Sequence, residues 1–113
     1  MQDLDSLFVD EEKKEVIIPF EGKEFKIMVK QLTWSKKNKI LSDCFTFNSD
    51  GTIKFGTDKY MKLMLSEMIT EAPWGKTNEI FLSRIKPEFG SKLESLVPKA
   101  FDQEMVPAFL KEE

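Results

Sequence analysis

The first candidates for acid–base chemistry are two glutamates spaced four residues apart, Glu67 and Glu71, with Glu79 following them. On a helix this spacing places two carboxylates on one face. Such a pair can act as general acid and general base when an apolar cleft separates the two pKa values. The residues around these glutamates do not predict a cleft, so we interpret them as solvated acids.

The chain lacks the residues that usually serve nucleophilic catalysis and metal binding. The 113 residues include no histidine, and Cys44 is the single cysteine. A Ser–His or Cys–His pair therefore cannot be built from this chain, and no cluster has the spacing of zinc ligands. Cys44 follows Ile40 and Leu41 on an apolar stripe, so we expect a small buried hydrophobic residue. We predict no enzyme, no cofactor and no metal site, and a lone cysteine fits a reducing compartment such as the cytoplasm.

Three lysines, Lys36, Lys37 and Lys39, cluster at the start of a predicted helix. They could contact an acidic partner or a phosphate backbone, although a solvated helix face is the more ordinary interpretation. The net charge of the chain is -3, and the lysines have no interleaved arginine. Nucleic acid is therefore not the expected partner.

The clearest periodic pattern lies between Thr57 and Glu71. Large apolar residues recur there one turn apart, at Tyr60, Met61, Met64, Leu65, Met68 and Ile69. This spacing predicts an amphipathic helix over 57–71, capped by Thr57 and ended by Pro73. We expect its stripe to be a buried core face, while its three methionines would also suit an adaptable binding surface.

A β-hairpin is predicted over 15–30. Apolar residues alternate along two runs, Val16, Ile18 and Phe20 in the first and Phe25, Ile27 and Val29 in the second. Gly22 provides the turn between them. Pro19 cannot donate a ladder hydrogen bond, which predicts an edge position for the first strand. The open edge must be either covered or used in self-assembly.

The remaining segments are expected to be mainly helical. We predict a first helix over 31–47, capped by Thr33 or Ser35, and then a turn loop with a short strand over 48–56. A short helix is expected after Thr77 and a longer one from Pro87. A last short helix is expected beyond Pro98.

The predicted fold class is therefore mainly α, a small helical domain of four to five helices with an N-terminal β-hairpin. Residues 1–14 are expected to be a flexible acidic segment, and residues 15–113 a single domain. Within that domain we assign the hairpin to 15–30 and a helical bundle to 32–110. No membrane span or secretion signal is expected.

Apolar residues near both ends of the chain have two interpretations. Leu4, Leu7 and Phe8 belong either to a frayed tail or to a segment that docks on a partner or on a neighbouring copy. Apolar residues after Pro98 either pack on the core or capture a partner. The residues that we expect to contact a partner are Trp34, Met61, Met64, Met68, Trp74, Phe101 and Phe109.

The order of short motifs adds a family resemblance. A Leu32–Ile40 stretch, LTWSKKNKI, opens the first helix, and Asp58-Lys59-Tyr60 opens the second. That second helix leads to Glu71-Ala72-Pro73, and Ile85–Glu88 reads IKPE. Over 15–97 this order resembles the tail assembly chaperones of long-tailed phages and related viruses.

The resemblance implies a non-enzymatic protein that binds the tape-measure protein and helps to recruit tail-tube subunits. It also implies self-association, hence a homo-oligomer, and a location in the host cytoplasm during virus assembly. A structural virion component, such as a tail-completion or connector protein, is the alternative. A small nucleic-acid regulator acting through Lys36, Lys37 and Lys39 is a third hypothesis, which predicts a steep loss of affinity with salt.

Overall fold

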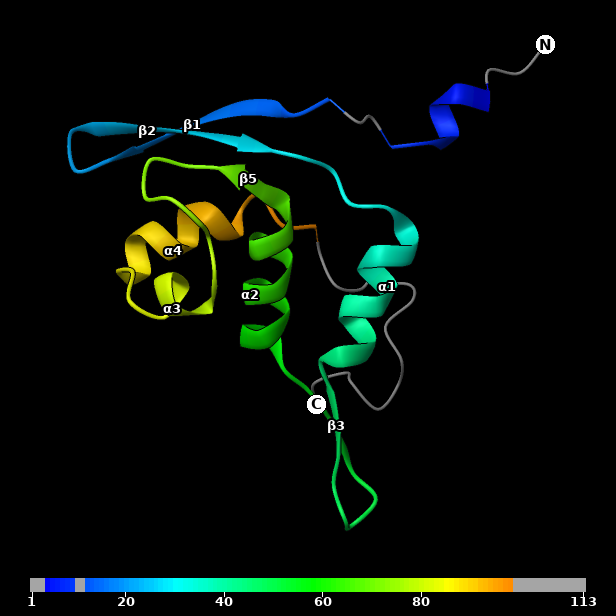
Figure 1. Cartoon of the computed structure of the whole chain (residues 1–113). Helices are drawn as coiled ribbons and strands as arrows, with labels where there is room; N and C mark the ends of the chain where they lie inside the picture. Colours follow the sequence, from blue (N-terminus) through cyan, green and yellow to red (C-terminus); the bar gives the residue numbers. More distant parts are fainter. Residues whose placement is uncertain (1–3, 10–11, 99–113) are drawn as a thin grey trace.

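The structure, a computed structural model, describes residues 4–9 and 12–98 (Figure 1). In chain order the elements are η1 (Leu4–Leu7), β1 (Lys14–Phe20), β2 (Lys23–Val29), α1 (Trp34–Asp43), β3 (Phe45–Phe47), β4 (Ile53–Phe55), α2 (Thr57–Met68), β5 (Ile69–Glu71), α3 (Glu79–Leu82) and α4 (Pro87–Glu94). In Figure 1 the sheet β1-β2-β5 lies along one side of the domain, with α2, α3 and α4 beneath it.

The prediction of a mainly α fold is wrong, because the domain is a small α/β fold. Its described part is 41% helix and 25% strand, with three helices of seven or more residues and five strands in two sheets. One sheet has the order β1-β2-β5, and the other is the two-stranded pair β3-β4. Two segments predicted to end helices, Phe45–Phe47 and Ile69–Glu71, form the strands β3 and β5 instead.

The predicted β-hairpin forms. β1 and β2 pair antiparallel from Lys14 opposite Val29 to Phe20 opposite Lys23. Glu21 and Gly22 make the two-residue turn with φ of 50° and 76°, the left-handed conformation that a tight hairpin requires. Among the described strands β1 pairs only with β2, so Pro19 lies in an edge strand as its missing N–H predicts.

The helix expected over 57–71 ends three residues early. α2 stops at Met68, and Ile69–Glu71 form β5, which pairs with the end of β2. The Lys30 N–H donates to the Met68 carbonyl oxygen at 2.9 Å, which joins the end of β2 to the end of α2. Ile69 is β-branched and suits either element, and the free edge of β2 decides between them. Thr57 is the first helical residue rather than the cap, which is Gly56.

The first helix is also shorter than predicted. α1 covers Trp34–Asp43, and Thr33 is its cap, accepting a hydrogen bond from the Lys36 N–H at 3.1 Å. Phe45–Phe47 then pair with Ile53–Phe55 instead of continuing the helix. In Figure 1 this second hairpin extends away from the rest of the domain.

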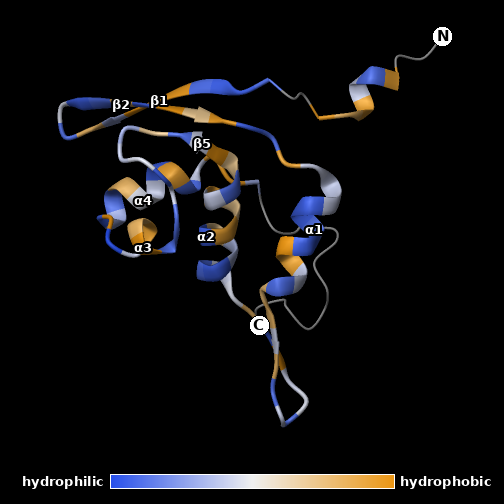
Figure 2. Cartoon of the chain, viewed as in Figure 1, coloured by the Kyte–Doolittle hydropathy of each residue, from blue (hydrophilic) through white to orange (hydrophobic). Residues whose placement is uncertain are grey.

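The core consists of two adjoining apolar clusters with α2 between them. One cluster joins the sheet to α2 and α4, and its buried residues are Ile18, Ile27, Leu65, Ile69, Phe89 and Leu93. The other joins α1 to α2, and its buried residues are Ile40, Cys44, Tyr60, Met64 and Met68. Figure 2 shows hydrophobic residues interspersed with polar ones along α2. The structure therefore confirms that the stripe of α2 is a core face.

The C-terminal elements follow the prediction in part. Pro87 occupies the first turn of α4, as predicted, whereas Asn78 rather than Thr77 caps α3. The Tyr60 hydroxyl donates to the Pro98 carbonyl oxygen at 2.8 Å, which fastens the end of the described chain to α2. The short helix expected beyond Pro98 lies outside the described residues, as does the later part of the bundle assigned to 32–110.

Candidate protein-binding groove

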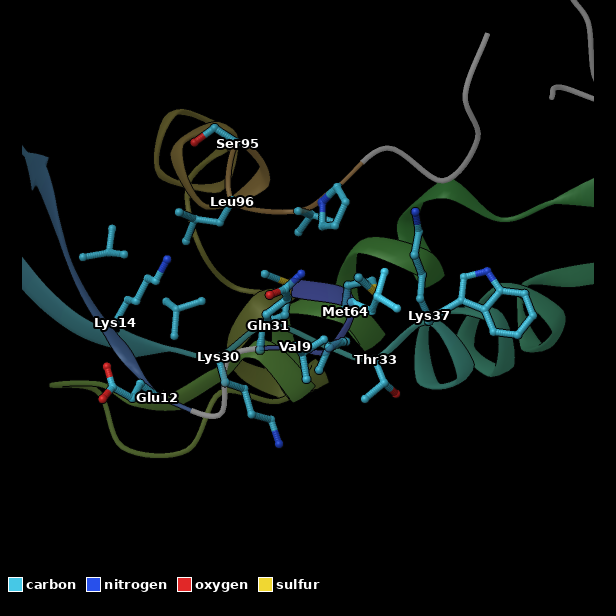
Figure 3. A pocket seen from close by; sticks show the side chains of 18 residues that line it. Val9, Glu12, Lys14, Lys30, Gln31, Thr33, Lys37, Met64, Ser95 and Leu96 are labelled. Atoms are coloured by element: carbon cyan, nitrogen blue, oxygen red, sulfur yellow. The ribbon is translucent and has the colours of Figure 1, made fainter. Parts of the chain in front are cut away.

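A groove of about 730 Å³ lies where five parts of the chain meet. The N-terminal segment, the open end of the β1-β2 hairpin, the start of α1, the end of α2 and residues 95–98 surround it (Figure 3). The backbone bond between Lys30 and Met68 and the cap bond of Thr33 fix the loop that joins β2 to α1. The volume of the groove falls within the roughly 300–1,000 Å³ that is typical of binding pockets.

The floor of the groove is apolar. The side chains that form it come from both core clusters, namely Val16, Val29, Leu32, Met64, Met68 and Leu96. Met64 and Met68 are 1% and 7% exposed, so they offer little surface to a ligand. Apolar surface at the base of a groove favours a partner that brings its own apolar side chains.

Trp34 lines the groove and is 81% exposed. It is the first residue of α1, directly after the Thr33 cap, so the start of the helix positions its ring. Large aromatic side chains anchor protein interfaces because they bury much area while few torsion angles are fixed. An indole this exposed on the rim of an apolar groove is typical of a partner contact.

Three lysines and one glutamate give the rim an excess of positive charge. Lys14, Lys30 and Lys37 line the groove together with Glu12. Figure 3 shows Lys14 and Lys37 on opposite sides with Met64 between them. Within residues 4–9 and 12–98, none of the three lysine ammonium groups forms an ion pair with a carboxylate. The rim therefore attracts an acidic ligand.

The acid–base candidates are not gathered into a site. β5 begins between Glu67 and Glu71, so the two carboxylates do not share a helix face. Glu67 instead pairs with Lys36 at 3.5 Å. The described residues contain no group of three His, Cys, Asp or Glu side chains that could hold a metal ion. Over the same part of the chain, no helix is long and apolar enough to cross a membrane.

Cys44 is 2% exposed in the cluster between α1 and α2, and burial raises the pKa of its thiol. Both effects reduce reactivity, since the nucleophile is the exposed thiolate. We expect native Cys44 to react with a disulfide reagent at least about a hundredfold more slowly than the same residue in urea-unfolded protein. Absorbance of the released thiolate measures both rates. Native labelling at the unfolded rate would contradict the predicted burial.

The residues expected to contact a partner divide among several places. Trp34, Met64 and Met68 line the groove. Met61 is half-buried and lines a separate hollow between α2 and α4. Trp74 belongs to an aromatic cluster at the other end of the sheet, where it stacks on Phe81 with a centroid distance of 4.7 Å.

The indole N–H of Trp74 donates to the Thr77 hydroxyl at 2.8 Å, which supplies the partner that a buried tryptophan requires. Phe101 and Phe109 lie outside the described residues. The groove residues that sequence reasoning missed include Lys14, Lys30 and Leu96, which come from three distant segments. Each looked like an ordinary surface or core position in its own segment, so no local pattern joined them.

Comparison with models of protein families finds no match, and comparison with curated proteins and with solved structures finds no significant similarity to this chain.

Proposed function

We propose that this protein is a non-enzymatic tail assembly chaperone that binds an apolar helical segment of a tape-measure protein and helps to recruit tail-tube subunits in the host cytoplasm. The motif order from Leu32–Ile40 to Ile85–Glu88 supports the family. The observation that carries the binding role is the groove of about 730 Å³, with its apolar floor and the exposed ring of Trp34 in its lining.

A groove of this kind suits a chaperone for a long helical protein. Its floor accepts apolar side chains that would otherwise aggregate, and an amphipathic helix laid in a groove presents such side chains at one-turn intervals. The lysines on the rim favour segments that carry acidic residues beside their apolar stripe.

The test is co-expression with the tape-measure protein encoded nearby, followed by size-exclusion chromatography with light scattering. We expect a soluble complex where the tape-measure protein alone precipitates. A tape-measure protein that stays insoluble in the presence of a soluble, folded partner would refute the proposal.

Lys37→Glu is expected to separate binding from stability. α1 has no acidic residue in its first turn, and Lys37 lies near the positive end of the helix dipole. The change should therefore stabilise the fold by about 0.3–1 kcal/mol while it weakens binding of an acidic partner segment. Urea unfolding and titration calorimetry measure the two effects.

Lys39→Glu is the matched control, because Lys39 lies on the same helix but does not line the groove. It should leave the affinity near that of the unchanged protein. Equal losses of affinity in both variants would show that overall charge, and not the groove, attracts the partner.

The second candidate function is a structural virion component, and the β3-β4 hairpin favours it. This hairpin extends from the domain, and Phe47 at the end of β3 is 75% exposed. A protruding strand pair with an exposed aromatic side chain can insert into a neighbouring subunit. Detection of the protein in purified virions supports this function, and its absence from them supports the chaperone.

A further inference from the structure

The N-terminal segment of the chain has the composition of a ligand for the groove. Leu4, Leu7 and Phe8 are spaced at i, i+3 and i+4, which gives one apolar stripe on a helical turn. The structure forms a helical turn there, η1, and Figure 2 colours much of it as hydrophobic. Residues 3–12 carry five acidic side chains and no basic one.

The apolar side chains of the same segment are largely exposed in the part of the chain that the structure describes. Leu4, Leu7 and Phe8 are 61%, 74% and 73% exposed. Leu7 and Val9 line the groove of their own chain, and Figure 1 shows η1 beyond the start of β1. Within residues 4–9 and 12–98, the chain therefore presents an apolar groove and a largely exposed apolar segment beside it.

The charges of these two surfaces are complementary. Lys14, Lys30 and Lys37 face the groove against the single carboxylate of Glu12. Apart from Glu12, which lines the groove, residues 3–11 carry four acidic side chains and no basic one, so the charge of the segment is opposite to that of the groove. An apolar stripe flanked by acids fits an apolar floor flanked by lysines, and the charge pattern selects this pairing over a neutral apolar helix.

We propose that the segment Leu4–Phe8 of one copy docks in the groove of a second copy, and that the exchange is reciprocal. A reciprocal exchange uses the same two surfaces on both copies, so it closes as a two-fold dimer. Leu4, Leu7 and Phe8 would lie on the floor of the partner's groove, beside its Trp34. The proposal concerns the groove of the proposed function but does not depend on the identity of the tape-measure protein.

Two variants of the full chain separate the two surfaces. The first is Leu4→Ser/Leu7→Ser/Phe8→Ser, which removes the apolar stripe and leaves the groove intact. The second is Trp34→Ala/Lys37→Glu, which alters the groove and leaves the segment intact. Both change exposed or half-exposed residues, so both should fold, which circular dichroism and urea unfolding check.

Sedimentation equilibrium gives the dissociation constant of each dimer. We expect the unchanged protein to dimerise and each variant alone to dimerise at least about tenfold more weakly. An equimolar mixture of the two variants should form a heterodimer of intermediate affinity, because it keeps one of the two contacts. Added salt should weaken the dimer of the unchanged protein.

Three results would overturn the proposal: a monomeric unchanged protein, dimerisation of the segment variant at full strength, or no association in the mixture. Ile17→Ser is the control for pairing through the open edge of β1, and it should not affect dimerisation. Failure to bind a tape-measure protein would leave these outcomes unchanged, so the two proposals fail separately.

Discussion

Replacement of Trp34 by alanine is expected to weaken the complex with a tape-measure segment by about 2–4 kcal/mol, roughly a 30- to 1,000-fold higher Kd. The indole lines the groove and is 81% exposed, so a partner can bury nearly all of it. Because the ring makes few contacts within the free domain, the free energy of unfolding should change by less than about 0.5 kcal/mol. Titration calorimetry and urea unfolding measure the two quantities.

Phe47→Ala is the matched control for this variant. Phe47 is 75% exposed, comparable to Trp34, but it lies on β3 and does not line the groove. Its replacement should leave the affinity unchanged. If Phe47→Ala weakened the complex and Trp34→Ala did not, the partner would bind the β3-β4 hairpin, and the groove would not be the binding surface.

Leu93→Ala is expected to destabilise the domain by about 2–5 kcal/mol, which is a large part of the roughly 5–15 kcal/mol available to a domain of this size. Leu93 on α4 is 0% exposed and belongs to the cluster that joins α4 to the sheet. The truncation removes buried apolar surface and leaves a cavity. Chemical denaturation followed by tryptophan fluorescence measures the loss.

Ile80→Ala provides the comparison for Leu93→Ala. Ile80 is 72% exposed on α3, so its truncation should change the free energy of unfolding by less than about 0.5 kcal/mol. A loss in Leu93→Ala as small as that expected for Ile80→Ala would mean that the contact of α4 with the sheet is not part of a cooperative core.

The sequence predicted the hairpin and the core face of α2 well, because both depend on the spacing of apolar residues within one segment. Apolar residues alternate from Val16 to Phe20, which places them on one face of a strand. The four-residue spacing of Tyr60, Met64 and Met68 places them on one face of a helix. The strands β3 and β5 could not be predicted in this way. Phe45 and Ile69 fit a helical stripe as well as a strand, and the strand is chosen by a pairing edge elsewhere in the chain.

Some residues of the groove could also be predicted from the sequence, and others could not. Trp34 was among the residues predicted to contact a partner, and it lines the groove. Lys14, Lys30 and Leu96 were not, because their proximity depends on the return of β2 to the end of α2 and on the path of the chain after α4. A site assembled from distant segments requires the tertiary structure.

The most direct test of the binding role of the groove is amide hydrogen exchange of the complex with a tape-measure segment. We predict new protection in residues 29–34 and 95–97, which line the groove, and unchanged exchange in the β3-β4 hairpin. Protection confined to residues 45–55, with exchange around the groove unaltered, would contradict the assignment of the groove as the binding site.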